Sequence, residues 1–155
     1  NGDEGATGTA VDSKDCTFFV GGYRGGVLPT KGFLRAFTPD GDLLWKRDDG
    51  TSGPGWVASL VTDGTGRIWV ASRGLHESGD DPERIGQDSV ASVLRVFVRD
   101  GIPLWVRWIG DAEENSAIDI AAVGSGDLRL VGSVSSGLFG AIPNWASGSF
   151  LIEIR

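Results

Sequence analysis

The sequence contains one hairpin motif twice. Residues 34–47 (LRAFTPDGDLLWKR) and 94–107 (LRVFVRDGIPLWVR) are identical at eight of fourteen aligned positions. In each copy an apolar run leads into an Asp-Gly pair, and a second apolar run containing Trp follows. Asp-Gly between two apolar runs is a strong local signal for a β-hairpin. A repeated unit of this kind has to stack on copies of itself to bury its faces, so we expect a repeat architecture.

A second shared segment precedes each hairpin. Residues 11–21 (VDSKDCTFFVG) align without a gap on residues 62–72 (TDGTGRIWVAS), and both segments predict a strand, a turn and a strand. A third, partial copy follows and lacks the fourth strand. The expected strands are 6–11, 17–21, 33–38 and 43–47 in the first unit, 57–62, 67–72, 92–98 and 103–108 in the second, and 116–122, 128–133 and 149–154 in the third.

Four short antiparallel strands in a repeat of about fifty residues are typical of a β-propeller blade. Strand segments such as 17–20 (TFFV) and 67–71 (RIWVA) are apolar almost throughout, as expected when neighbouring sheets cover both faces. Gly, at 25 of 155 residues, interrupts every long segment, which argues against helices. We predict an all-β protein in which residues 1–155 form one propeller segment, with blades at about 6–48, 56–109 and 116–155 and the third blade incomplete.

These motifs carry a family resemblance. The segments VDSKDCTFFVGGY, FLRAFTPDGDLLWKR and TDGTGRIWVAS resemble bacterial β-propeller repeats of the SBBP type. Those repeats follow the approximate pattern AIAVD-x-x-G-N-V-Y-V-T-G and then D-P-x-G-x-x-L-W. The third unit departs from the pattern, because Val123 replaces the turn Asp and the Leu-Trp hairpin is absent. The resemblance implies a propeller fold and no single activity.

The number of units bears on how the fold is completed. Closed propellers usually have four to eight blades, so three blades would leave two apolar faces uncovered. We therefore expect the chain to be part of a larger ring. The remaining blades would come from another part of the polypeptide or from a second copy of the chain.

Two repeated residue types in the strands have structural interpretations. Trp45, Trp69 and Trp105 fall at matching strand positions or inside apolar runs, so we expect all three in the core. Arg35 and Arg95 repeat within the third strand of their units. We expect each to pair with a turn carboxylate or a backbone carbonyl at a blade edge.

Charge and composition exclude several classes of partner. The formal net charge is −7 and the pI is near 4.6, so nucleic acid is a poor partner, because phosphate binding needs a positive surface. The longest apolar run is too short to span a membrane. Cys16 is the single cysteine, which excludes an internal disulfide, and His76, the single histidine, lies sixty residues away. We interpret Cys16 as a packed or turn residue rather than a nucleophile.

Loop lengths suggest which end of the sheets binds a partner. In a meander, connections alternate between the two ends of the sheet. The first-to-second and third-to-fourth connections are short, whereas the others run over 22–32, 48–56, 73–91, 109–115 and 134–148. Variable loops on a rigid scaffold commonly carry function, so we expect binding at the long-loop end. The candidate ligand- or partner-binding residues there are Tyr23, Arg24, Trp56, Arg73, His76, Glu77, Asn144 and Trp145.

The loop 73–88 is also rich in carboxylates. Asp80, Asp81 and Glu83 supply hard oxygen ligands that suit Ca²⁺ or another divalent ion. Their spacing matches no known calcium loop, so we favour a solvated turn and expect no cofactor, with Ca²⁺ as the alternative.

The sequence favours a non-enzymatic interaction module, because no catalytic constellation repeats or converges. Such a module would belong to an exported protein, in the periplasm, on the cell surface or secreted, and would bind a protein or a glycan. Two alternatives stay open. One is a carbohydrate-binding, lectin-like propeller, and the other is part of a propeller enzyme whose catalytic residues lie outside this chain.

Overall fold

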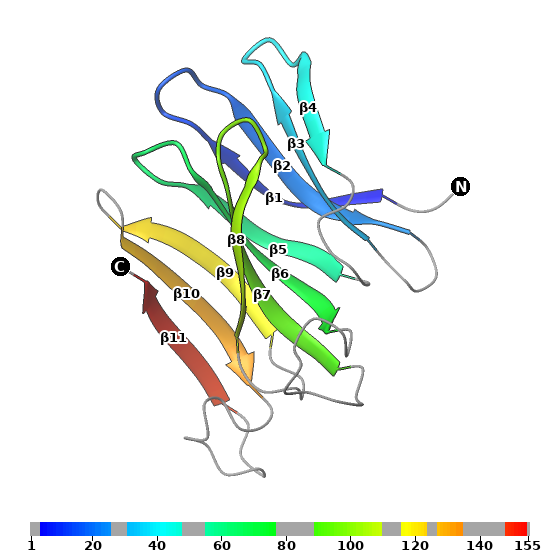
Figure 1. Ribbon diagram of the computed structural model, residues 1–155, viewed down its shortest axis with the longest axis vertical. Coiled ribbons are helices and arrows are strands. Elements are labelled where there is room, and N and C mark those ends of the chain that lie inside the picture. Colours follow the sequence, from blue (N-terminus) through cyan, green and yellow to red (C-terminus); the bar gives the residue numbers. More distant parts are fainter. Residues whose placement is uncertain are drawn as a thin grey trace.

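The computed structural model describes residues 4–25, 31–47, 55–76, 89–109, 116–123, 127–134 and 148–154. Within these residues the chain is all-β and forms three antiparallel sheets (Figure 1). The first sheet is β1 (Glu4–Val11), β2 (Phe18–Arg24), β3 (Lys31–Phe37) and β4 (Leu43–Arg47); the second is β5 (Gly55–Thr62), β6 (Ile68–His76), β7 (Ser89–Phe97) and β8 (Pro103–Ile109); the third is β9 (Ser116–Val123), β10 (Asp127–Val134) and β11 (Gly148–Ile154). The order within each sheet follows the chain, as a meander requires.

Both predicted Asp-Gly hairpins are present and share one backbone geometry. In the first, Thr38 N donates to Asp42 O (2.8 Å) and Gly41 N to Thr38 O (3.0 Å). In the second, the corresponding bonds of residues 98–102 measure 2.9 and 2.8 Å. Gly41 and Gly101 have φ of +92° and +76°, a region in which a Cβ is unfavourable. The turn conformation therefore explains the repeated glycine.

The structure corrects the gapless alignment of the segments that precede these hairpins. The turn after β1 closes with a bond from Asp12 N to Thr17 O, and the turn after β5 with one from Asp63 N to Arg67 O, so the first turn is one residue longer. Phe18 pairs with Phe37, and Ile68 occupies the same place opposite Phe97. A shift of one residue moves a strand's side chains to the opposite face.

Corrected in this way, Phe19 corresponds to Trp69 and not to Val70. Phe19 and Trp69 both face the sheet that follows in the chain. The same direction holds for Leu34 and Leu94 in the third strands. Each sheet thus offers one kind of face to the sheet before it and another kind to the sheet after it.

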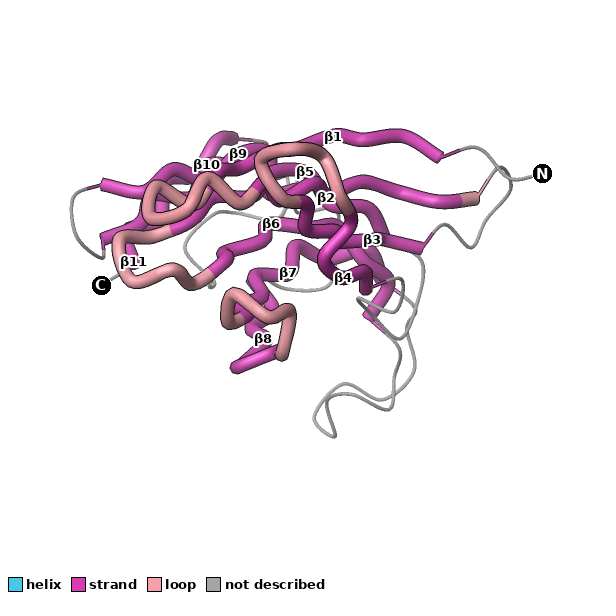
Figure 2. The backbone as a smooth tube through the Cα atoms, turned by 90° about the horizontal axis from the view of Figure 1, so that it is seen from above, coloured by secondary structure: helices cyan, strands magenta, loops and turns pink. Residues whose placement is uncertain are grey.

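The three sheets pack against one another through two apolar layers. β5 contacts β1, β2 and β3, and β9 contacts β5, β6 and β7. Between the first and second sheets lie Phe19, Leu34, Ala36, Val57, Leu60, Ile68, Val70 and Phe97. Between the second and third lie Trp69, Ala71, Leu94, Val96, Ile109, Ile120, Leu128 and Leu130. Seen from above, the sheets spread apart from the side that carries β1, β5 and β9 (Figure 2).

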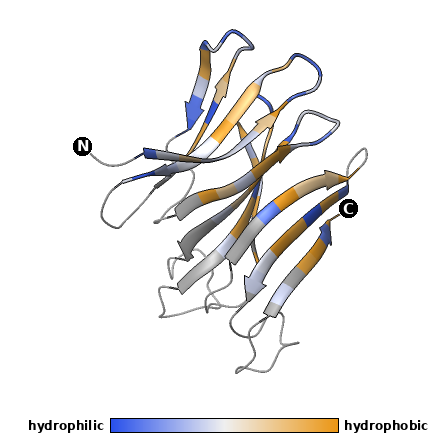
Figure 3. Cartoon of the chain, turned by 180° about the vertical axis from the view of Figure 1, so that it is seen from behind, coloured by the Kyte–Doolittle hydropathy of each residue, from blue (hydrophilic) through white to orange (hydrophobic). Residues whose placement is uncertain are grey.

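Polar contacts tie the same layers together. Thr62 Oγ1 donates to Val11 O (2.8 Å) between the first and second sheets. Ser59 Oγ and Asp119 Oδ1 lie 2.6 Å apart between the second and third. Figure 3 shows the accompanying pattern of hydropathy, with hydrophobic bands along the strands between more hydrophilic ones and hydrophilic connections at the turn end. No helix in the described residues is long and apolar enough to cross a membrane.

The expected equivalence of the repeated tryptophans holds in register but not in burial. Trp69 is buried as expected, and Trp45 is half-buried. Trp105, predicted to be in the core, is 40% exposed. Trp45 lies against the 98–102 turn, whereas the described part of the third sheet has no fourth strand or hairpin turn to cover Trp105. The difference therefore arises in the neighbouring sheet and not in the repeat itself.

Of the two repeated arginines, Arg35 has a partner other than those expected. Arg35 Nη2 donates to Glu4 Oε1 (3.1 Å), a carboxylate at the start of β1 and not in a turn. Arg95 Nη1 lies 2.9 Å from the Ser72 hydroxyl of the neighbouring strand. Both arginines thus bond to a side chain of their own sheet.

Candidate functional site

Tyr23 and Arg24, the first of the residues expected at the long-loop end, lie within β2. They pair in register with Gly5 and Glu4. Arg24 Nε forms an ion pair with Glu4 Oε1 (3.2 Å). The Tyr23 ring covers Gly5 so closely that a Cβ on Gly5 would lie 2.5 Å from it. Both side chains thus make contacts within the first sheet.

Three further candidates lie at the same end of the second sheet. Trp56 in β5 is the register partner of Arg73 in β6, and His76 ends β6 opposite Ser89. The remaining candidates fall outside the described residues: Glu77, Asn144 and Trp145, together with the metal-ligand candidates Asp80, Asp81 and Glu83. No group of three or more His, Cys, Asp or Glu suited to a metal ion occurs in the described part of the chain.

The opposite, short-turn end holds a polar network around Asp63. This carboxylate is buried in the turn after β5. Its Oδ1 accepts from Thr65 N (2.9 Å) and Arg67 N (3.1 Å), and Thr65 Oγ1 lies 2.6 Å away. Its Oδ2 accepts from Arg67 Nε and from Trp69 Nε1, both at 2.7 Å. The network fixes the turn and satisfies the indole of a core tryptophan.

These bonds control the protonation of Asp63. Burial alone raises the pKa of a carboxyl group, because the charged form loses water. At Asp63 the hydrogen bonds from Thr65, Trp69 and Arg67 outweigh burial and hold the pKa well below its ordinary value. Asp63 is therefore a permanently charged acceptor at neutral pH.

Asp12 occupies the corresponding position in the first sheet but finds its cation in the next sheet. Its Oδ1 accepts from Lys14 N (2.9 Å), which repeats the local turn bond. Arg99, in the hairpin turn of the second sheet, places Nε 3.8 Å from Asp12 Oδ2 and forms an ion pair with Asp15. It also donates to Thr17 Oγ1 (3.1 Å). Asp12 Oδ2 itself is buried with no hydrogen-bond partner among the described residues.

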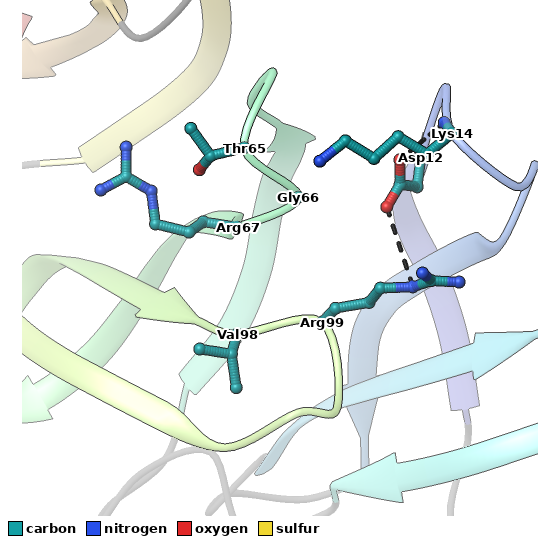
Figure 4. Close-up of a pocket in the computed structure, with 7 residues that line it drawn as sticks. All are labelled: Asp12, Lys14, Thr65, Gly66, Arg67, Val98 and Arg99. Atoms are coloured by element: carbon teal, nitrogen blue, oxygen red, sulfur yellow. Dashed lines mark hydrogen bonds and ion pairs between the residues drawn. The ribbon is translucent and has the colours of Figure 1, made fainter.

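A pocket of about 220 Å³ opens between these turns (Figure 4). Its lining consists of Asp12, Lys14, Thr65, Gly66, Arg67, Val98 and Arg99. Asp12, Lys14 and Arg99 meet at this space between the first and second sheets, whereas the Arg67 side chain points away from it and bonds to Asp63 (Figure 4). The combination of a carboxylate with cationic side chains offers a place for binding or for locking the two sheets together.

The hairpin turn of residues 98–102, which carries Arg99, also contacts β4 of the first sheet. Trp45 Nε1 donates to Arg99 O (3.0 Å), and Arg47 Nε donates to Gly101 O (2.9 Å). A Cβ built on Gly101 would lie 3.0 Å from the Trp45 ring, so the ring rests directly on the glycine. We call this pair of side chains, Trp45 and Arg47, the turn clamp.

Sequence reasoning missed the short-turn end, because it treated the short turns as connections. A local signal was available in the recurrence of Asp12 and Asp63 at the start of equivalent turns. The partners of Asp63 lie within six residues of it, whereas Arg99 is 87 positions beyond Asp12. The second pairing follows only from the stacking of the sheets.

Cys16 gives a test of the corrected turn alignment. Cys16 N donates to Asp12 O just as Gly66 N donates to Asp63 O, and Cys16 has a φ of +57°. A residue with a Cβ pays about 1 kcal/mol or more in this region, so Cys16→Gly should stabilise the fold by roughly 0.5–1 kcal/mol. Thermal melting would measure the gain, with Cys16→Ala as the control that removes the thiol and keeps the strain. Equal melting temperatures of Cys16→Gly and Cys16→Ala would contradict the left-handed conformation of Cys16 and the turn alignment that depends on it.

Comparison with known proteins adds no family assignment: a scan against protein-family models found no match, and a search of curated proteins found none either.

Proposed function

We propose that the chain is a non-enzymatic interaction module, a segment of a β-propeller that binds a protein partner through sheet faces left open at its ends. One comparison carries the proposal. Phe18 on the first sheet is 41% exposed, whereas its equivalent in the second sheet, Ile68, is fully buried by the first sheet. The first sheet thus exposes the kind of face that the second sheet buries.

The open face of the first sheet extends across all four of its strands. Val11, Phe18, Phe37 and Leu43 are successive register partners from β1 to β4. Phe37 is half-buried, and the other three are exposed. On the outer face of the third sheet, the partners Val131 and Leu151 are exposed as well. A further sheet would suit the open face of the first sheet, since a sheet covers the equivalent positions inside the chain. The outer face of the third sheet also carries the Arg129–Glu153 ion pair (3.0 Å) beside Val131 and Leu151.

A radial arrangement is supported by the contacts of the first strands. β1 contacts β5, and β5 contacts β9, so these three strands adjoin and would form the inner ring of a propeller. We propose this radial arrangement together with repeats of the SBBP type. We also propose that the protein is exported. The long-loop end, with Trp56 beside Arg73, would then present a second surface to a protein or a glycan.

Self-association tests the open face. If it binds a further sheet, the isolated chain should associate in a concentration-dependent way in sedimentation velocity, with the third sheet of one copy standing in for the missing neighbour of another. Phe18→Asp should abolish association, because a charge on the open face cannot be buried without a partner. Circular dichroism would check that the variant is folded.

Ile102→Asp is the matched control. Ile102 is exposed in the hairpin turn, away from the open face, and the first repeat has Asp42 at the same position. This variant should associate as the original chain does. A chain that stays monomeric up to high micromolar concentrations, or a Phe18→Asp variant that associates unchanged, would refute the proposal.

A further inference from the structure

The second sheet carries a copy of the turn clamp. Trp45 pairs in register with Ala36, and Trp105 pairs with Val96 in the same way. Arg47 pairs with Leu34, and Arg107 pairs with Leu94. Trp105 and Arg107 therefore stand on β8 where the turn clamp stands on β4.

This second clamp points toward the third sheet. Val96 and Leu94 belong to the apolar layer between the second and third sheets. The Trp105 ring meets Trp69 of that layer edge-on, with ring centroids 5.4 Å apart and planes at 81°. Trp105 and Arg107 are exposed, and neither donates a side-chain hydrogen bond within the described part of the chain.

The third sheet presents a matching edge. Ile154 at the end of β11 pairs with Leu128, just as Phe97 at the end of β7 pairs with Ile68. In the second sheet, the turn held by the turn clamp begins one residue after Phe97 and leads into the fourth strand. β11 has β10 on one side, and its other edge is unpaired among the described residues. An unpaired edge offers backbone groups to an incoming strand.

We propose that Trp105 and Arg107 form a receptor for a β-hairpin turn that leads a fourth strand onto the open edge of β11. The inference rests on the proposed function, in which material outside the described sheets completes them. The occupant is a polypeptide segment with the chemistry of residues 98–109: a turn with two free carbonyls, a glycine and an apolar strand. Glycine is favoured at this turn for two reasons: its φ is positive, and a Cβ on Gly101 would lie only 3.0 Å from the Trp45 ring. Gly41, which no tryptophan covers, has open space around it.

The experiment supplies such a segment. Residues 99–109 (RDGIPLWVRWI) are appended directly after Arg155, so that Arg155 takes the place of Val98. The extension should raise the melting temperature by about 5 °C. The reason is that the added turn and strand gain hydrogen bonds and apolar contacts with β11 and the second clamp. The indole N–H of Trp105, assigned by its loss in Trp105→Phe, should become protected from hydrogen exchange.

Three variants define the outcome. Trp105→Ala should lower the melting temperature of the extended chain by several degrees more than that of the original chain. Arg107→Ala should act in the same direction. Replacing the glycine of the appended turn by Val should remove the stabilisation, because a β-branched residue is strained at the positive φ of this turn and its Cβ would crowd the ring.

The inference and the proposed function fail in different ways. An extension that stabilises the Trp105→Ala chain as much as the original chain would overturn the receptor and leave the proposed function standing. An extension that stabilises neither chain would also overturn it, since β11 would then not accept a strand. The proposed function would instead be refuted by an original chain that does not associate, or by association that Phe18→Asp leaves unchanged.

Discussion

Asp63→Ala should destabilise the fold by about 3 kcal/mol, since it leaves a buried indole N–H without an acceptor and breaks charge-assisted hydrogen bonds. Trp69, whose Nε1 donates to Asp63, is only 4% exposed, so water cannot replace the lost carboxylate. Urea denaturation at neutral pH measures the change. Asp42→Ala is the control, because this exposed turn residue uses its backbone in the hairpin and should change stability by about 0.5 kcal/mol or less.

The same network makes stability depend on pH in a defined direction. The pKa of Asp63 lies below its ordinary value near 3.8, so its charged form stabilises the folded state. That contribution is complete above the pKa of the unfolded chain and is lost as the pH falls below it, toward the pKa of the folded state. Asp63→Asn, which stays neutral, should show a smaller loss of stability between pH 5 and pH 2. An identical acid profile in both proteins would show that the charge of Asp63 contributes nothing.

Trp45→Ala should cost about 3 kcal/mol, at the lower end for a large aromatic residue because Trp45 is only half-buried. It removes a hydrogen bond to Arg99 O, the cover over Gly101 and a contact with Phe19 at a centroid distance of 6.0 Å. Trp105→Ala should cost about 1 kcal/mol, because its ring is already partly in solvent. Denaturant midpoints of the two variants give the comparison.

Trp45→Phe separates the two parts of the larger effect. It keeps a ring over Gly101 and removes the indole N–H. The free energy of unfolding of Trp45→Phe should therefore lie between that of the original chain and that of Trp45→Ala. Equal losses for Trp45→Ala and Trp105→Ala would contradict the difference in burial and would favour the equal cost expected from the repeat alone.

The sequence sufficed to predict the hairpins and the meander, because these depend on local rules. Asp-Gly at 40–41 and 100–101 needs a left-handed glycine, and the flanking apolar runs supply the strands. It did not suffice for the alignment of the preceding strands. The turn after Asp12 contains one extra residue, and it closes because Cys16 adopts a left-handed conformation that usually requires glycine. The amino-acid sequence gives no local sign of this conformation.

The candidate site was harder to predict, because its contacts join separate sheets. Arg99 reaches Asp12 and Asp15 only after the second sheet stacks on the first. The exposure of Trp105 likewise depends on the sheet that follows it, so two matching positions in the repeat have different surroundings. The candidate binding residues were predicted in and beside the long loops, and most of these loops lie outside the described residues.

The uniform direction of the sheet faces gives the stack a polarity. Leu34 and Leu94 both face forward along the chain, while Phe97 faces backward, so the two ends of the stack are chemically different surfaces. Two copies joined head to tail would repeat the contact found inside the chain, whereas a symmetric pair joined head to head would not. Head-to-tail contacts either close into a ring or propagate as a filament, depending on the rotation between successive members. The tilt of one sheet on the next, more than the chemistry of its residues, would then decide between a finite assembly and an endless one.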